Sequence, residues 1–197
     1  MDASRLYERT LVLLKPDAVQ RGLVGTILAR FEEAGLKIVA LKLLLVDPEF
    51  VSAHYPNTPE WIRGMGKKTL ASYEEHGKDP IEEVGTDDPQ AIGEMVKGWN
   101  VEYLTSGPVA ACVVEGLHAI QVVRKMCGHT LPYLAEPGTI RGDFSVASPI
   151  AANLLKRAVR NLIHASSTPE EAGHEIAHWF SDEELVQFDS TDESALF

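Results

Sequence analysis

The sequence predicts an α/β fold of the α+β type, in which four strands form one antiparallel sheet with helices on its faces. Apolar runs at residues 10–14, 36–46, 109–115 and 161–166 have the length and composition of buried strands. Segments with apolar residues at helical spacing lie between these runs. The order is strand, helix, strand, insertion, strand, helix, loop, strand, helix. This order is typical of the split βαβ, or ferredoxin-like, pattern.

The first half of the pattern lies in residues 10–55. The strand at 10–14 ends at Lys15-Pro16-Asp17, where we expect the proline to stop the strand and begin a turn. An apolar stripe predicts a helix over 22–34, which Gly35 terminates. The second strand follows at 36–46. Asp47-Pro48 then begins a helix that reaches Tyr55, because Asp favours the N-cap and Pro the first turn.

The composition changes at Pro56, and the chain stays polar and rich in proline as far as Gly107. Two helices are plausible in this stretch, at 59–76 and 89–103. The later expected elements, in chain order, are a strand at 109–115, a helix at 118–126, an irregular loop at 128–142, a helix at 149–160, a strand at 161–166, a helix at 169–180, a short helix capped by residues 181–184, and a disordered tail after residue 188.

Charge and composition exclude several classes of protein. A net charge of −11 argues against a nucleic-acid surface, although a few local cations can still bind a small anion. Cys112 and Cys127 are expected to be buried free thiols. The N-terminal residues lead into no apolar signal segment, and no apolar run is long enough to span a bilayer. We therefore expect a cytoplasmic protein without a membrane partner.

The stretch from Asn161 to Ser166 contains the strongest candidate for a catalytic residue. It places His164 at the end of a short apolar run, with an amide three residues before it and hydroxyls after it. A neutral imidazole is a competent nucleophile toward phosphorus near pH 7. Cations able to hold phosphate are present as Lys15, Arg124 and Arg141. Taken alone, however, a histidine in an apolar segment is more often structural.

Further motifs extend along most of the chain. They are Glu8-Arg9-Thr10, Lys15-Pro16-Asp17-Ala18, Arg21-Gly22-Leu23-Val24-Gly25, His54-Tyr55, Ser106-Gly107-Pro108-Val109, Glu115-Gly116, Gly138-Thr139-Ile140-Arg141-Gly142-Asp143-Phe144, Asn161-Leu162-Ile163-His164 and Trp179-Phe180. In order and in most spacings the series resembles the nucleoside diphosphate kinase family. One such motif is weak evidence, whereas the full series is strong.

The resemblance implies an enzyme that transfers the terminal phosphate of a nucleoside triphosphate to a nucleoside diphosphate by a ping-pong mechanism. His164 matches the nucleophile that becomes a phosphohistidine, and Glu175 matches the carboxylate that orients it. Ser166 is a further donor nearby. The implied nucleotide-binding residues are Lys15, Tyr55, Arg124, Thr130, Arg141 and Asn161. Mg²⁺ is expected to arrive with the nucleotide rather than in a protein metal site. The implied partners are nucleoside tri- and diphosphates, and a homo-oligomer, hexameric or tetrameric.

The chain departs from the family pattern in three places. Two predicted insertions, at about 56–98 and 147–160, interrupt a single domain that spans 1–188, and 189–197 forms the tail. The first insertion changes the region that holds the base, where Val96 or Trp99 could lie. The third departure is Ser167, which stands where the family usually has an acidic residue.

Other interpretations remain open at this stage. The chain could be a non-catalytic nucleotide-binding or scaffolding member of the family, or a regulatory domain that binds an anionic metabolite without turnover. Individually, Lys15 could be a strand-end charge, and Arg141 could pair with its neighbour Asp143. Arg124 and Glu175 could be exposed helix positions. The sequence contains no Walker-type phosphate loop.

Overall fold

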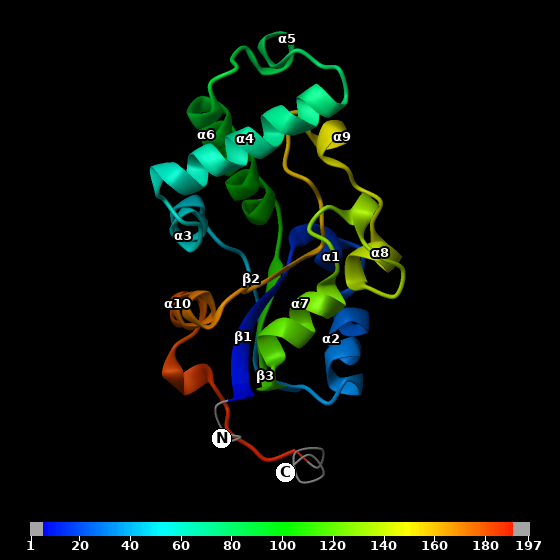
Figure 1. Cartoon of the computed structure of the whole chain (residues 1–197). Coiled ribbons are helices and arrows are strands. Elements are labelled where there is room, and N and C mark those ends of the chain that lie inside the picture. Colours follow the sequence, from blue (N-terminus) through cyan, green and yellow to red (C-terminus); the bar gives the residue numbers. More distant parts are fainter. Residues whose placement is uncertain (1–5, 191–197) are drawn as a thin grey trace.

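The sheet of this protein has the strand order β2-β3-β1-β4, and every neighbouring pair is antiparallel. These strands belong to a computed structural model that describes residues 6–190 (Figure 1). The strands are β1 (Tyr7–Leu14), β2 (Lys37–Leu44), β3 (Val109–Leu117) and β4 (Ile163–Ala165). The predicted ferredoxin-like sheet is therefore confirmed.

Helices cover both faces of this sheet. They are α1 (Pro16–Gln20), α2 (Val24–Glu33), α3 (Pro48–His54), α4 (Pro59–Glu75), α5 (Pro80–Val84), α6 (Pro89–Thr105), α7 (Ala119–Cys127), α8 (Ile140–Phe144), α9 (Pro149–Leu154) and α10 (Pro169–Trp179), with short 3-10 helices η2 (Pro132–Leu134) and η3 (Asp182–Glu184). Figure 1 shows α10 on one side of the strands and α2 and α7 on the other.

The central strand β1 explains this layering, because its side chains alternate between the two faces. Leu11 and Leu13 belong to the apolar cluster that includes Trp179 of α10. Val12 and Leu14 belong to the cluster that includes residues of α2 and α7. All four β1 side chains are fully buried. The strand is thus the shared centre of two cores.

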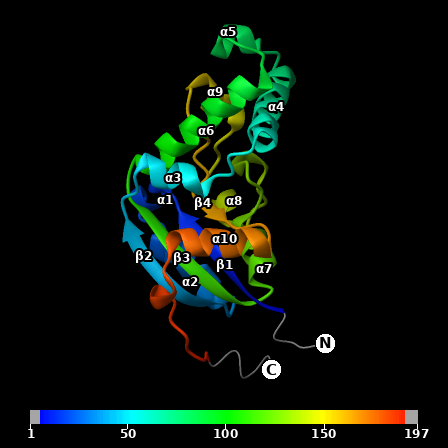
Figure 2. The same cartoon turned by 90° about the vertical axis from the view of Figure 1, so that its left-hand side faces the viewer.

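A helical layer formed by α4, α5 and α6 extends beyond one end of the sheet (Figure 2). Two glycines let α4 and α6 pack closely. A Cβ atom on Gly66 would lie 1.8 Å from the carbonyl oxygen of Pro89, and one on Gly93 would lie 2.0 Å from that of Ile62. Either substitution would force the two backbones apart. Helix α4 also contacts α9, so the two predicted insertions touch each other.

Most of the predicted helices are confirmed. The regions predicted at 22–34, 47–55, 59–76, 89–103, 118–126 and 169–180 hold α2, α3, α4, α6, α7 and α10. Local sequence signals determine their starts. The Asp47 carboxylate accepts a hydrogen bond from the backbone N–H of Phe50 at 2.8 Å, as its N-cap role requires. Cys112 and Cys127 are buried free thiols, as expected.

Three expected loop regions contain helices instead. The turn predicted at Pro16 is the first turn of α1, because the fixed φ of proline also suits the first position of a helix. Helix α5 lies between the two predicted helices of the polar region. The expected loop at 128–142 holds η2 and the start of α8, which the Thr139 hydroxyl caps by accepting from the N–H of Gly142 at 3.1 Å.

The helix predicted at 149–160 is wrong in its extent, because α9 ends at Leu154. The chain reverses at Lys156, whose φ is 50°. The N–H of Lys156 bonds to the Asn153 carbonyl at 2.9 Å, and that of Arg157 to Ala152 at 3.1 Å. This is the helix-ending pattern that glycine usually supplies. The strand predicted at 161–166 is also shorter, since β4 covers only Ile163–Ala165.

Two statements from the sequence concern the ends of the chain and the bilayer. The predicted tail at 189–197 lies mostly outside the described residues, which end at 190. Within residues 6–190, none of the helices combines the length and the apolar character needed to cross a bilayer.

Candidate active site

His164 lies in the short edge strand β4, where its backbone pairs with Leu13 of β1. Its side chain is 23% exposed, and its Nε2 atom lies 2.8 Å from Oε1 of Glu175 in α10. The other carboxylate oxygen accepts a 2.5 Å hydrogen bond from the Ser166 hydroxyl. Because a carboxylate only accepts, Nε2 of His164 carries the proton. The lone pair of the ring is therefore on Nδ1.

Glu175 is ionised in this arrangement. Burial alone raises the pKa of its carboxyl group, but the hydrogen bonds from His164 and Ser166 outweigh that effect and hold the pKa below its usual value. Only 3% of the residue is exposed. The plain interpretation of Glu175 as an exposed helix position is wrong, and an anion is fixed against one edge of the His164 ring.

Lys15 and Asn161 form the next part of the site. Lys15, between β1 and α1, is buried and donates from Nζ to the Asn161 side-chain oxygen at 2.8 Å. The amide nitrogen of Asn161 donates to the backbone oxygen of Thr130 at 3.0 Å. Burial and the nearby Arg141 charge together lower the pKa of Lys15 to about 8, against a raising effect of Asp17. Lys15 is therefore a buried ammonium, not an ordinary strand-end charge.

Arg141 of α8 holds the backbone around His164. Its guanidinium donates to the carbonyl oxygens of Asn161 at 3.2 Å, Gly128 at 2.8 Å and Ile163 at 2.6 Å. The alternative pairing of Arg141 with Asp143 is wrong, because Asp143 pairs with Arg30 at 2.5 Å. Arg141 thus places a positive charge beside Lys15 and fastens the segment that leads into β4.

The backbone just before His164 is strained. The N–H of Ile163 bonds to the Asn161 carbonyl at 2.7 Å around Leu162, whose φ is 68°. This is the rare kind of γ-turn that branched and bulky residues seldom adopt. Leu162 is fully buried, and its carbonyl accepts from the backbone N–H of Lys15 at 2.8 Å. The turn therefore ties the nucleophile candidate to the lysine.

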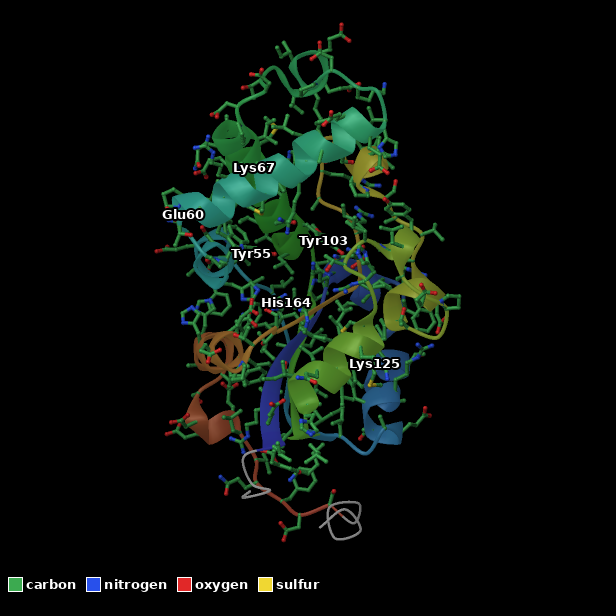
Figure 3. All side chains as sticks on the ribbon, viewed as in Figure 1. Tyr55, Glu60, Lys67, Tyr103, Lys125 and His164 are labelled. Carbon is green, nitrogen blue, oxygen red and sulfur yellow. The ribbon has the colours of Figure 1, made fainter. Side chains whose placement is uncertain are left out.

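The remaining predicted residues surround this centre. Tyr55 follows α3, with its ring 5.0 Å from that of His54, and burial raises its pKa. Figure 3 shows the labelled Tyr55, and Tyr103 near the C-terminal end of α6, on the side of His164 that faces α4. Arg124 of α7 is exposed, as its plain interpretation expects, but it reaches the Ala165 carbonyl at 3.3 Å. Thr130 is exposed and joins the group through its backbone oxygen.

Three residues that received no role from the sequence also belong to this neighbourhood. His54 of α3 packs edge-on to His164 with ring centroids 4.8 Å apart, and Trp179 of α10 donates from its indole nitrogen to Nδ1 of His54 at 3.2 Å. The Tyr103 hydroxyl donates to Asp17 at 2.5 Å, while Lys15 Nζ lies 5.2 Å from the Tyr103 ring centre. His54 and Trp179 lie in the quoted motifs, but their pairing depends on tertiary structure.

The acidic residue expected near position 167 is replaced by another carboxylate. Glu171, one turn into α10, accepts from the Ser167 hydroxyl and from its backbone N–H at 2.6 Å. Within the described chain, one group of three potential metal ligands lies close together, namely His54, His164 and Glu175, with ligand atoms within 4.8 Å. Their mutual hydrogen bonds, and those from Ser166 and Trp179, already engage these side chains.

Comparison with known proteins gives a consistent result. The sequence model of the nucleoside diphosphate kinase family matches residues 8–61 and 96–185 of this chain. A nucleoside diphosphate kinase from Pyrobaculum aerophilum is 51% identical over 180 residues, which cover 91% of this chain and 98% of that protein. The crystal structure of an NDP kinase from the same organism superposes with a TM-score of 0.90 at 49% identity, covering 92% of this chain and 100% of that one.

A second solved structure is a transition-state mimic of the nucleoside-diphosphate kinase from Borrelia burgdorferi with bound vanadate and ADP. It superposes with a TM-score of 0.77 at 37% identity and covers 97% of both chains. Residues 62–95, which fall in the first predicted insertion, lie outside the match to the family model.

Proposed function

This chain belongs to the nucleoside diphosphate kinase family, and we propose that His164 is the residue through which it passes phosphate from one nucleotide to another. The enzyme transfers the terminal phosphate of a nucleoside triphosphate to a nucleoside diphosphate by a ping-pong mechanism with a phosphohistidine intermediate. The observation that supports His164 in this role is its hydrogen bond from Nε2 to Glu175, which leaves the lone pair on Nδ1.

In the first half-reaction Nδ1 of His164 attacks the terminal phosphorus of the triphosphate. The bond from that phosphorus to the bridging oxygen breaks, and the nucleoside diphosphate leaves with the electron pair. The ring becomes a phosphorylated imidazolium, which the buried carboxylate of Glu175 stabilises through Nε2–H. In the second half-reaction the terminal oxygen of another diphosphate attacks the same phosphorus, and Nδ1 regains its lone pair.

The cations near His164 fit the demands of phosphoryl transfer, which depends mainly on positioning and charge. We assign Lys15, Arg141 and Arg124 to the phosphate oxygens. Three of the five guanidinium N–H donors of Arg141 hold backbone carbonyls, which fixes the direction of the others. Tyr55, Thr130 and Asn161 are assigned to the nucleotide as polar contacts, and Ser166 supports Glu175.

We propose that Mg²⁺ binds with the nucleotide. When bound, the ion neutralises charge on the phosphate oxygens. Mg²⁺ prefers oxygen ligands. The group of His54, His164 and Glu175 offers two nitrogens and one carboxylate that is already hydrogen-bonded, so it is a poor Mg²⁺ site by itself. This ligand set fits an ion that is held by the nucleotide phosphates. The protein thus contributes cations to this site, and the phosphates contribute the ligands of the ion.

A labelling experiment tests the assignment of His164. The protein is incubated with γ-labelled ATP and Mg²⁺, and the phosphorylated position is then identified by peptide mass spectrometry. We expect an acid-labile, base-stable label on His164 that moves to GTP when GDP is added. Label on another residue, or turnover without any labelled protein, would overturn the assignment.

The pKa of Lys15 leads to a pH-dependence prediction. Its folded-state pKa, lowered to about 8, means that the ammonium is present below that pH and is lost above it. Nucleotide phosphates bind the charged form, so the Kd of ADP should rise by about tenfold per pH unit above about 8.5. Calorimetric titrations between pH 7 and 10 check this, with proton uptake on binding in the alkaline range. Unchanged affinity across that range would contradict it.

We also propose that the protein is a homo-oligomer, hexameric or tetrameric, in which β2 forms an interface. Strand β2 lies at one edge of the sheet; Leu41 and Leu43 in it and Leu45 directly after it are 54%, 64% and 76% exposed. Alternating exposed leucines on an edge strand form an apolar strip that a second copy can cover.

Leu43→Lys is expected to shift the protein to a smaller species in light scattering coupled to gel filtration, because a charge would be buried at the interface. Val146→Lys is the matched control. Val146 is 89% exposed in the segment before α9, so the same charge there should leave the assembly unchanged. Equal masses for the two variants and the unaltered protein would exclude β2 as the interface.

The segments 56–98 and 147–160 are proposed as insertions into a single domain. We propose that Val96 and Trp99, both half-buried on α6, lie near the bound base. Because α4 contacts α9, any effect of the first insertion on base binding is expected to depend on the second. Deleting Lys156–Arg157 should therefore alter the relative Kd values of ADP and GDP, measured by calorimetry.

A further inference from the structure

The hydrogen bond between Trp179 and His54 determines the protonation of the His54 ring. An indole N–H can only donate, so Nδ1 of His54 must carry a lone pair to accept it at 3.2 Å. The ring is therefore neutral, with its proton on Nε2. Both side chains are buried, at 2% exposed for Trp179 and 4% for His54, so solvent does not compete for this contact.

The same Nδ1 atom lies close to the carboxylate that orients the nucleophile. It is 3.7 Å from Oε1 of Glu175, and this oxygen also accepts from Nε2 of His164 at 2.8 Å. At 3.7 Å the two atoms form no hydrogen bond in this structure, but a proton on Nδ1 would let the His54 ring donate to the same oxygen after a small shift. His164 would then share its acceptor with a second histidine.

We propose that Trp179 and His54 are positioning residues that reserve Oε1 of Glu175 for His164 and thereby keep Nδ1 of His164 as the phosphate acceptor. The inference rests on the proposed role of His164. Hydrogen-bond directions around the carboxylate are then fully determined, because the Ser166 hydroxyl accepts from the N–H of Leu11 at 3.3 Å and donates to Oε2. Each oxygen of Glu175 has one assigned donor.

The charges that face His54 come from three elements and support its neutral state. His164 of β4, His178 of α10 and Lys15 at the end of β1 oppose a charge on the ring, whereas Glu175 of α10 favours one. Burial is the largest influence, and the combined effect lowers the pKa of His54 to about 3. A neutral His54 is thus maintained at any pH at which the fold is expected to be stable.

The test removes the donor and keeps an aromatic ring. In Trp179→Phe, Nδ1 of His54 is free to take a proton and to donate to Glu175. We expect ¹H–¹⁵N NMR of the ring nitrogens to show His54 with its proton on Nε2 in the unaltered protein and a mixture of tautomers in the variant. Burial keeps the pKa of His54 low in the variant as well, so its ring stays neutral. The rate of His164 labelling by γ-labelled ATP should therefore fall by about threefold, and by the same factor at pH 6 and at pH 8, because part of the His54 population competes for Oε1 of Glu175.

Two further variants separate this effect from packing. Phe50 packs on Trp179 with ring centroids 4.9 Å apart but forms no part of the Trp179–His54 hydrogen bond. Phe50→Leu should therefore loosen the same aromatic contact while the tautomers and the labelling rate stay unchanged. Adding His54→Leu to Trp179→Phe removes the competing donor, and the labelling rate should return toward that of the unaltered protein.

The outcomes are distinct. A proton on Nδ1 of His54 in the unaltered protein would overturn the inference without any variant. An equal labelling rate in Trp179→Phe and in the unaltered protein would also overturn it, as would an equal loss in Phe50→Leu. Failure of the proposed function looks different, because labelling would then be missing from His164 in the unaltered protein whatever tautomers the NMR experiment reports.

Discussion

His164→Ala is expected to lower kcat by a factor of about 10⁴ or more, because the substitution removes the atom that forms the covalent intermediate. The protein should also take no label from γ-labelled ATP. Transfer from ATP to GDP, followed by chromatography of the nucleotides, measures the loss. The fold should survive, since the His164 side chain is 23% exposed and Glu175 keeps its bond from Ser166.

His174→Ala is the matched control for this prediction. His174 is an exposed histidine of α10, one position before Glu175 in the chain, and it should change kcat by less than about twofold. Retention of transfer by His164→Ala would show that the phosphate does not pass through this ring. Loss of transfer in both variants would instead indicate that α10 is generally sensitive to substitution.

Arg141→Met is expected to damage both stability and activity. The substitution removes the guanidinium donor from three carbonyl oxygens around the His164 segment, of which that of Asn161 keeps a second donor, the N–H of Ile163. We expect a loss of about 3 kcal/mol in the free energy of unfolding. The Tm should fall by about 6–12 °C. Nucleotide affinity should fall as well, because the substitution removes a charge that we propose contacts the phosphates. Thermal scans and calorimetric ADP titrations measure the two effects separately.

Arg124→Met removes the same charge without the same backbone contacts. Arg124 is exposed and has one 3.3 Å bond to the Ala165 carbonyl. We expect weaker ADP binding but a Tm within about 3 °C of the unaltered protein. If both arginine variants lost the same stability, the three carbonyl contacts of Arg141 would not account for its effect.

The fold was largely predictable because its main elements have strong local signals. Asp47-Pro48 begins α3 and Gly35 follows α2, and both boundaries lie where N-cap and C-terminal preferences place them. The strand order followed from the sequence of elements. The prediction failed at α9, because Lys156 adopts a left-handed φ that sequence preference assigns to glycine. Short helices such as α1 and α5 lack the several turns that make periodicity visible.

The reactive residues of the site were predictable from the sequence, but the contacts among them were not. The motif around His164 identified the nucleophile candidate, and the resemblance to the family assigned it Glu175 as a partner, which the structure places in hydrogen-bond contact. The direction of that bond could not be obtained from sequence. Nor could the contact between Trp179 and His54, which lie 125 residues apart in the chain and meet only when α3 packs against α10. The contacts of Arg141 with backbone carbonyl groups could not be predicted either, because every residue has a carbonyl group and the sequence does not show which ones an arginine will reach.

The central position of β1 has a consequence for synthesis of the chain. Its residue Leu14 pairs with Ala110 and Ile163, about 100 and about 150 residues further along. At ribosomal rates of roughly 5–20 residues per second, β4, the last strand to pair with β1, is synthesised about 10–30 s after it. During that interval the run Leu11–Leu14, fully buried in the finished protein, remains unpaired. The nascent chain therefore exposes an apolar segment during that interval, and chaperone binding to it is expected to govern the yield of folded enzyme.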